Sequence, residues 1–288
     1  MNSLQIWVAA TRPKTLIASV SPILIGSVLA LSHHSLPWEW CICLLITGLG
    51  IQIGTNLCND YYDFLKGGDS AQRKGPLRVT AAGLVSQQTM RKAIILTCIM
   101  TIIAGLPLVA RGGLVIAFLL AGALLLGWMY TGGPYPLAYL GLGECFVFPF
   151  FGPVATACAY FLLTRTFSWE AGYAGIAPGL FSTALLIANN MRDVEEDRKT
   201  GKRTLVVRFG THFGIWEYGV TSLFAILASA FFWRNFPWTS LTLALLIPAS
   251  RLVYRLAHAQ GNYHPVFSGI GMLFWAYTLL FSIGVYLG

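Results

Sequence analysis

Charged residues are scarce in this chain of 288 residues. Asp, Glu, Lys and Arg together make up 10% of it, whereas hydrophobic residues make up 56%. A soluble domain carries about 25% charged residues. This shortage excludes an ordinary soluble domain and predicts a polytopic membrane protein.

Two further features are missing from the sequence. The six cysteines lie mostly within apolar runs, and Cys41 and Cys43 have no matching second pair of the kind that binds zinc. No short apolar core is followed by a small-residue cleavage site, so we expect no signal peptide. The net charge of +8 could indicate nucleic-acid binding, but the basic residues lie in loops between apolar runs. We therefore expect contact with membrane lipid and no nucleic-acid partner.

Apolar runs of membrane-spanning length recur along the chain. About 20 apolar residues cross the hydrocarbon core of a bilayer. Nine runs meet this length, at roughly 15–32, 38–63, 93–110, 113–130, 143–164, 172–192, 213–233, 238–256 and 266–287. The sequence therefore predicts an all-α fold of nine transmembrane helices that form one domain over residues 1–288.

Lysine and arginine divide unevenly between the loops that join these runs. If the N-terminus is cytoplasmic, sixteen basic residues lie on the cytoplasmic side and only Arg111, Arg165 and Arg234 lie outside. Cytoplasmic loops of membrane proteins are enriched in Lys and Arg. The distribution predicts a cytoplasmic N-terminus and a C-terminus on the outer side.

Aspartate is the rarest acidic residue, and its positions are not scattered. All five aspartates fall in two short segments, NLCNDYYDFLKGGDS (56–70) and NNMRDVEEDRKTGKR (189–203). Each segment follows an apolar run that points toward the cytoplasm. Residues three and four apart share one helix face, so we expect the acids and asparagines of each segment to line one face. These residues are Asn56, Asn59, Asp60 and Asp63 in the first segment, and Asn189, Asp193 and Asp197 in the second. The two faces would lie at the same depth and could face each other across a cavity.

Acids at the C-terminal end of a helix face the negative end of its dipole, which costs typically 0.3–1 kcal/mol each. Such a cluster needs cations, and carboxylate and amide oxygens suit Mg²⁺, which usually takes one or two carboxylates plus substrate phosphates. The predicted metal ligands are Asp60, Asp63, Asp69, Asn56, Asp193 and Asp197. Nearby amides and cations would bind a diphosphate, and these are Asn56, Asn59, Asn189, Arg73, Lys74, Arg78, Lys202 and Arg203.

The two motifs, N-x-x-N-D-x-x-D from Asn56 and N-x-x-x-D-x-x-x-D from Asn189, resemble those of the UbiA superfamily of intramembrane prenyltransferases. The chain is similar in particular to the 1,4-dihydroxy-2-naphthoate polyprenyltransferases of menaquinone biosynthesis. The segments that carry this likeness are RPKTL (12–16), NLCNDYYDFLKGGD (56–69), GPYPLAYLGLGE (133–144) and NNMRDVEEDRKTGKRTLVVRFG (189–210).

The chain departs from the superfamily pattern at two places. Gly67 stands four residues after Asp63, where the superfamily commonly has a third aspartate, and the third acid here is Asp69. Some relatives carry a Tyr-x-x-x-Lys motif, whereas this chain has Tyr135 followed by Tyr139. A lysine-based role at position 139 is therefore not expected.

The resemblance implies a nine-helix bundle around a central cavity in a bacterial cytoplasmic membrane. It implies Mg²⁺-dependent transfer of a polyprenyl chain from polyprenyl diphosphate to 1,4-dihydroxy-2-naphthoate, with decarboxylation, to give demethylmenaquinone. The aspartates would stabilise the departing diphosphate through the metal, and tyrosines would stabilise the allylic cation. The expected catalytic residues are Asp60, Asp63, Asp193, Asp197, Tyr130 and Tyr139.

Alternatives remain open at this point. The aromatic acceptor could be another naphthoate isomer or 4-hydroxybenzoate. A secondary transporter also uses acids within its helices to bind coupling ions. Glu144, a solitary acid at the start of the fifth helix, could be a base or a hydrogen-bonded structural acid.

Overall fold

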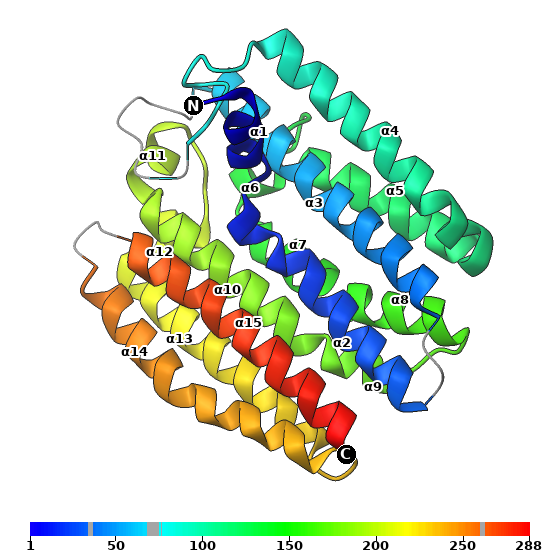
Figure 1. Cartoon of the computed structure of the whole chain (residues 1–288). Helices are drawn as coiled ribbons and strands as arrows, with labels where there is room; N and C mark the ends of the chain where they lie inside the picture. The colour runs from blue at the N-terminus through cyan, green and yellow to red at the C-terminus, as the bar shows by residue number, and fades with distance from the viewer. Residues whose placement is uncertain (34–36, 68–74, 76, 260–262) are drawn as a thin grey trace.

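The computed structural model describes residues 1–33, 37–67, 75, 77–259 and 263–288, and the described part is helical throughout (Figure 1). Three residues of the predicted site, Asp69, Arg73 and Lys74, lie outside the described residues. The elements are α1 (Ser3–Thr11), η1 (Pro13–Thr15), α2 (Ile17–His33), α3 (Trp38–Leu65), α4 (Gln87–Gly112), α5 (Leu114–Met129), α6 (Leu137–Leu140), α7 (Gly143–Phe150), α8 (Pro153–Thr164), α9 (Trp169–Ala174), α10 (Ile176–Arg192), α11 (Val194–Lys199), α12 (Leu205–Phe209), α13 (Thr211–Leu227), η2 (Ala228–Phe232), η3 (Pro237–Leu245), α14 (Leu246–Ala257) and α15 (His264–Leu287).

Seven helical stretches of the described chain are long and apolar enough to cross a membrane: Trp38–Leu65, Gln87–Gly112, Gly143–Thr164, Trp169–Arg192, Thr211–Phe232, Pro237–Ala257 and Pro265–Leu287. Helical segments Ser3–Thr15 and Ile17–Ser32 meet at 54°, and this bent pair brings the number to eight when it counts as one span. Helix α5 is apolar but has only 16 residues. The chain is thus an all-helical integral membrane protein with seven or eight candidate spans, and the run predicted over 113–130 forms the shorter α5.

The span that contains α10 is the most enclosed of the seven candidate spans. In this span, 72% of the most apolar window is buried, against 17% for α4. Figure 1 shows α10 beside α15 and α13, whereas α4 lies at the edge of the molecule. Small residues allow close packing of helix backbones inside a membrane, and a Cβ atom on Gly179 would lie only 2.4 Å from the Phe148 carbonyl oxygen. The helix that leads into the second aspartate segment is therefore held by direct backbone contact.

The first aspartate segment lies at the end of α3. Residues 38–55, which precede Asn56, form eighteen helical residues, or about 27 Å at 1.5 Å per residue. The hydrocarbon core of a bilayer is about 30 Å thick. The acids therefore lie near the edge of the hydrocarbon layer, and Figure 1 shows α11 at the same end of the molecule as the N-terminus.

Candidate active site

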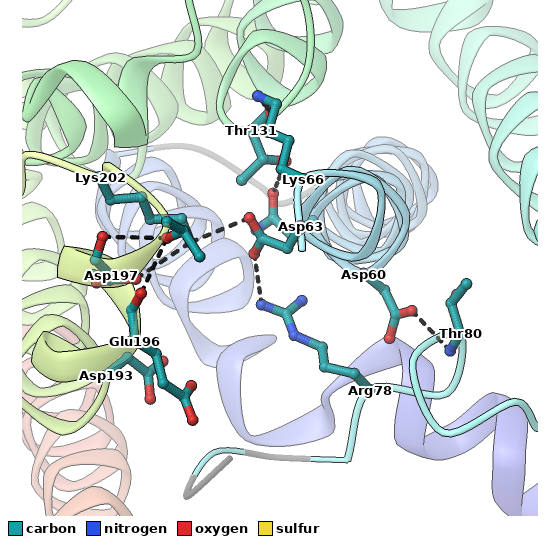
Figure 2. A network of polar contacts seen from close by, with 12 residues as sticks. Asp60, Asp63, Lys66, Arg78, Thr80, Thr131, Asp193, Glu196, Asp197 and Lys202 are labelled. Atoms are coloured by element: carbon teal, nitrogen blue, oxygen red, sulfur yellow. Dashed lines mark hydrogen bonds and ion pairs between the residues drawn. The ribbon is translucent and has the colours of Figure 1, made fainter. Parts of the chain in front are cut away.

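The two aspartate segments meet, as the helix-face argument predicts (Figure 2). The ammonium nitrogen of Lys202 lies 3.1 Å from Asp63 Oδ1 and 3.4 Å from Asp197 Oδ1. Asp63 is on the last turns of α3, whereas Asp197 is on α11, just after α10. Both carboxylates are buried, with 2% and 6% of each residue exposed. Two acids from distant parts of the chain thus converge on one cationic group.

Asp63 has a partner for each of its two oxygens. Arg78 donates from Nη2 to Oδ2 at 2.8 Å, and both side chains are buried. The Tyr139 hydroxyl donates to Oδ1 at 3.3 Å, beside the Lys202 contact. Opposite charges at this distance compensate the burial of a carboxylate, so the position of Asp63 is fixed from three sides.

Asp60 is placed differently from Asp63, although the two share a helix face. Its two carboxylate oxygens accept the backbone N–H groups of Val79 and Thr80, each at 3.0 Å. Only 1% of Asp60 is exposed. Figure 2 shows the Asp60 side chain directed to the segment that contains Thr80, away from Lys202.

The second segment supplies Asp193 and Asp197. Asp193 joins α10 to α11, and its carboxylate accepts two hydrogen bonds of 2.7 Å from the Arg192 guanidinium. Burial raises the pKa of Asp197 to about 6, against the opposing effect of Lys202, and the charges of Asp193 and Asp63 raise it further. Asp197 is thus the acid of this site whose ionisation the protein opposes.

The predicted asparagines serve different neighbours. Asn56 donates from Nδ2 to the Thr11 carbonyl at 2.9 Å and to the Thr15 hydroxyl at 3.2 Å, so it fastens the bend between α1 and α2. Asn59 accepts the Thr131 hydroxyl at 2.9 Å, which ties α3 to the segment after α5. Asn189 lies on the last turn of α10.

Arg203, which was predicted to bind diphosphate, is exposed, and its backbone N–H donates to the Tyr139 carbonyl. It therefore joins the segment after α11 to α6, next to the ring of Tyr139.

Two lysine ammonium groups lie near the ring of Tyr139. Lys66 Nζ lies 4.2 Å from the ring centroid and Lys202 Nζ lies 5.2 Å from it, which is cation–π geometry. Lys66 also donates to the Thr131 carbonyl at 2.6 Å. Burial lowers the pKa of Lys66 and the Lys202 charge lowers it further, whereas Asp63 raises it. Lys66 was not among the predicted site residues, although its spacing of three residues from Asp63 was a usable signal.

Tyr130 stands at one end of an apolar pocket. The pocket has a volume of about 190 Å³ and lies between α2, α3, α4, α5, α7 and α8. Along α5 its wall runs from Ile116 to Gly127, and Tyr130 follows directly after that helix. The distance from residue 116 to residue 130 is about 21 Å at 1.5 Å per residue. The site therefore adjoins a long apolar space whose polar end is next to Gly143 and the aspartates.

A second pocket, of about 530 Å³, lies between α3, α4 and α5. It shares Ile51, Thr55 and Gly127 with the first pocket. Those three residues thus form the wall between the two spaces.

The carboxylates of the site are the candidate ligands of a metal ion. Among the described residues, no group of three or more His, Cys, Asp or Glu side chains is arranged to hold one. Two carboxylates do converge, because Asp63 and Asp197 both contact Lys202 Nζ. Mg²⁺ usually takes one or two carboxylates and completes its octahedron with water and substrate phosphate oxygens. The residues present therefore fit Mg²⁺ together with a phosphorylated substrate.

The sequence of the chain also matches a known protein family. The model of the UbiA prenyltransferase family matches residues 19–276. The chain is a UbiA-family prenyltransferase. It is therefore an enzyme, and this assignment replaces the secondary-transporter alternative.

This UbiA-family prenyltransferase has curated relatives in several bacteria. It is 39% identical to the 1,4-dihydroxy-2-naphthoate octaprenyltransferase of Escherichia coli over 72% of this chain and 69% of that protein. It is 32% identical to the protein of the same name from Haemophilus influenzae, over 100% of this chain and 97% of that one.

Solved structures of the family share the fold. An apo UbiA homologue from Aeropyrum pernix superposes with a TM-score of 0.66 at 16% identity, and the match covers 96% of this chain and 98% of that one. A homologue from Archaeoglobus fulgidus, solved with GPP and Mg²⁺ bound, gives 0.62 at 13% identity over 98% and 99% of the two chains. At this level of identity the likeness extends to the fold alone.

Proposed function

We propose that the protein transfers a polyprenyl chain from polyprenyl diphosphate to 1,4-dihydroxy-2-naphthoate, with Mg²⁺ and with loss of the ring carboxylate, to give demethylmenaquinone in its hydroquinone form. The observation that carries this proposal is the convergence of Asp63 and Asp197 on one cationic position beside an apolar pocket. Bacterial relatives that bear the name of this activity, at 32% identity or more, support the choice of acceptor.

The proposed membrane topology has nine spans around a central cavity in a bacterial cytoplasmic membrane. Helix α5 and the bent pair of α1 and α2 complete the seven longer spans. The N- and C-termini lie at opposite ends of the molecule (Figure 1), which suits an odd number of crossings. The uneven distribution of Lys and Arg favours a cytoplasmic N-terminus and therefore an outer C-terminus.

Asp63 and Asp197 would hold the metal ion, with Asp193 one helical turn before Asp197. The chemistry that bound Mg²⁺ supplies is neutralisation of the diphosphate oxygens. Asp60 and Asn56 were predicted as ligands, but this proposal leaves them out because their side chains bind backbone and hydroxyl groups of neighbouring segments.

The cationic side chains of the site would bind the diphosphate. Lys202 and Lys66 both lie near the Tyr139 ring, and both carry hydrogen-bond donors for phosphate oxygens. As the bond between the prenyl carbon and the diphosphate oxygen breaks, both bonding electrons leave with the oxygen. Preorganised ammonium groups stabilise the negative charge that develops there.

The apolar pocket would accommodate the isoprenoid tail and shield the allylic carbon from water. Tyr130 lines that pocket and Tyr139 contacts Asp63, and the π face of either ring would stabilise positive charge. The electron-rich ring carbon then forms the new bond to the prenyl carbon. The electrons of the bond to the carboxylate return to the ring, and carbon dioxide leaves.

The test uses the purified protein in mixed micelles with radiolabelled octaprenyl diphosphate and 1,4-dihydroxy-2-naphthoate. We expect equimolar diphosphate, carbon dioxide and prenylated product, all of which depend on added Mg²⁺. Full turnover in excess chelator would exclude the metal. A panel with a naphthoate isomer and 4-hydroxybenzoate tests the acceptor, since faster turnover of either compound would replace the proposed one.

A further inference from the structure

The four aspartates of the two motifs differ in what they contact. Asp63 and Asp197 share Lys202, and Asp193 is bound by Arg192. Asp60 is instead enclosed among backbone groups, with both oxygens bonded to N–H groups of residues that follow it by 19 and 20 positions. This difference is independent of any ligand.

We infer that Asp60 is a positioning residue: it anchors the segment 77–80, places the Arg78 guanidinium on Asp63, and does not itself bind metal. The inference rests on the proposed function, because that function makes Asp63 the acid whose position matters.

The segment that Asp60 anchors is a compact folded turn. The Arg78 carbonyl accepts Ala82 N–H at 2.9 Å, and the Val79 carbonyl accepts the N–H groups of Leu84 and Val85 at 3.0 and 3.2 Å. Val79 is fully buried in a small apolar cluster with Ala10, Leu57, Val85 and Met90. A turn with this many internal bonds moves as one unit, so the two bonds from Asp60 fix the place of Arg78 as well.

Arg78 in turn selects the orientation of the Asp63 carboxylate. Its Nη2 holds Oδ2 at 2.8 Å (Figure 2), and Oδ1 contacts Lys202 and the Tyr139 hydroxyl. Asp60 and Asp63 are three residues apart on α3, so the turn bridges adjacent positions of one helix face. The path from Asp60 to the shared cation therefore runs through Val79, Arg78 and Asp63.

Occupied oxygens argue against direct metal binding by Asp60. Each Asp60 oxygen accepts one backbone N–H group, and only 1% of the residue is exposed. To reach an ion at Asp63 and Asp197 the carboxylate would have to turn away from these donors, which would leave buried N–H groups without an acceptor at a considerable cost. Side chains that orient metal ligands typically change metal affinity 10- to 100-fold when they are removed, so loss of affinity alone cannot identify a ligand.

The first measurement follows the amides of Val79 and Thr80 by hydrogen exchange, in native protein and in Asp60→Asn. The variant keeps the size of the side chain but loses one acceptor, and we expect exchange at these amides to become at least about tenfold faster. Asp193→Asn is the matched control and leaves them unchanged. Protection that stays native in Asp60→Asn overturns the anchoring. This experiment needs neither metal nor substrate, so its result is separate from the fate of the proposed function.

The second measurement is a double-mutant cycle on the binding of Mn²⁺ with inorganic diphosphate, followed by electron paramagnetic resonance. Asp60→Asn and Arg78→Gln should each weaken binding about tenfold. The double variant should bind no more weakly than the single variant with the larger loss, because both residues act on one path. Multiplied effects, about a hundredfold in the double variant, would make Asp60 an independent ligand and overturn the inference.

Two further outcomes of these experiments are decisive. If no variant and no native sample binds Mn²⁺ with diphosphate, the proposed function fails while the exchange data still decide the anchoring. If Asp60→Asn does not fold, Thr80→Pro removes one donated N–H and keeps the carboxylate. It should weaken Mn²⁺ binding to the same extent, whereas native affinity in Thr80→Pro would overturn the inference.

Discussion

The ammonium group of Lys202 lies 3.1 Å from Oδ1 of Asp63 and brings the second motif against the first. Lys202 comes from the segment after α11, and its Nζ also reaches Asp197 at 3.4 Å. A cation that bridges two carboxylates occupies the position that the proposed function gives to the metal and the diphosphate. Its removal is therefore the most direct test of the site.

Replacement of Lys202 by Met should raise KM for polyprenyl diphosphate at least about tenfold, because a charge-assisted contact to phosphate is lost. Steady-state kinetics with varied prenyl diphosphate measures this change. Lys202→Arg keeps the charge and should recover part of the loss. An unchanged KM in Lys202→Met would remove this residue from the diphosphate site.

Asp197 predicts a pH dependence of stability in the presence of chelator. Burial raises its pKa from 3.8 to about 6, so between these values the folded protein keeps a proton that the unfolded chain has released. The contribution of Asp197 to the free energy of unfolding is therefore fully present below about pH 4, and it is lost as the pH rises through 6.

Comparison with Asp197→Asn isolates this effect, since the amide does not titrate. In thermal unfolding at several pH values, the Tm of the variant relative to that of the native protein should increase by a few °C between pH 4 and pH 7. A difference in Tm that is constant over this range would contradict the raised pKa.

The length of the apolar pocket predicts a donor-length effect for Ala123, which lines it about midway along α5. Ala123→Phe should block the inner part of the pocket. Turnover with octaprenyl diphosphate should fall at least about tenfold, while dimethylallyl diphosphate is used as before. Competition between the two donors in one assay measures the ratio of their turnover rates. An equal loss of turnover with both donors would show that the isoprenoid tail lies elsewhere.

Close backbone packing predicts that Gly179→Ala destabilises the fold. The new Cβ would lie 2.4 Å from the Phe148 carbonyl oxygen and 3.2 Å from Gly152 Cα, and backbone atoms cannot move aside. Overpacking of this kind costs about 1–3 kcal/mol, measurable by denaturant titration in micelles. Gly122→Ala in α5 is the control, since nothing lies within 4 Å of its Cβ. A Gly179→Ala variant as stable as this control would disprove the close packing.

Much of this architecture is predictable from the chain itself. The positions of the helices follow from runs of apolar residues, because bilayer thickness imposes their length. The meeting of the two motifs follows from helix spacing and from the shared direction of α3 and α10.

The different contacts of Asp60, which binds backbone N–H groups, and Asp63, which binds cationic side chains, were not predictable. A spacing of three residues places both on one helix face, but the turn that binds Asp60 comes from a segment about twenty residues later. Lys66 was missed for a similar reason, because a lysine at a helix end is typical of a cytoplasmic anchor. Its spacing from Asp63 indicates a shared helix face, and its approach to Tyr139 on α6 distinguishes it from an anchor.

Helix α5 is the shortest of the proposed spans, and its 16 residues extend about 24 Å, less than the roughly 30 Å of an average hydrocarbon layer. Such hydrophobic mismatch is relieved by local thinning of the lipid around the short element. The membrane should therefore be thinnest beside α5, and lipids with short acyl chains should gather at this flank of the protein.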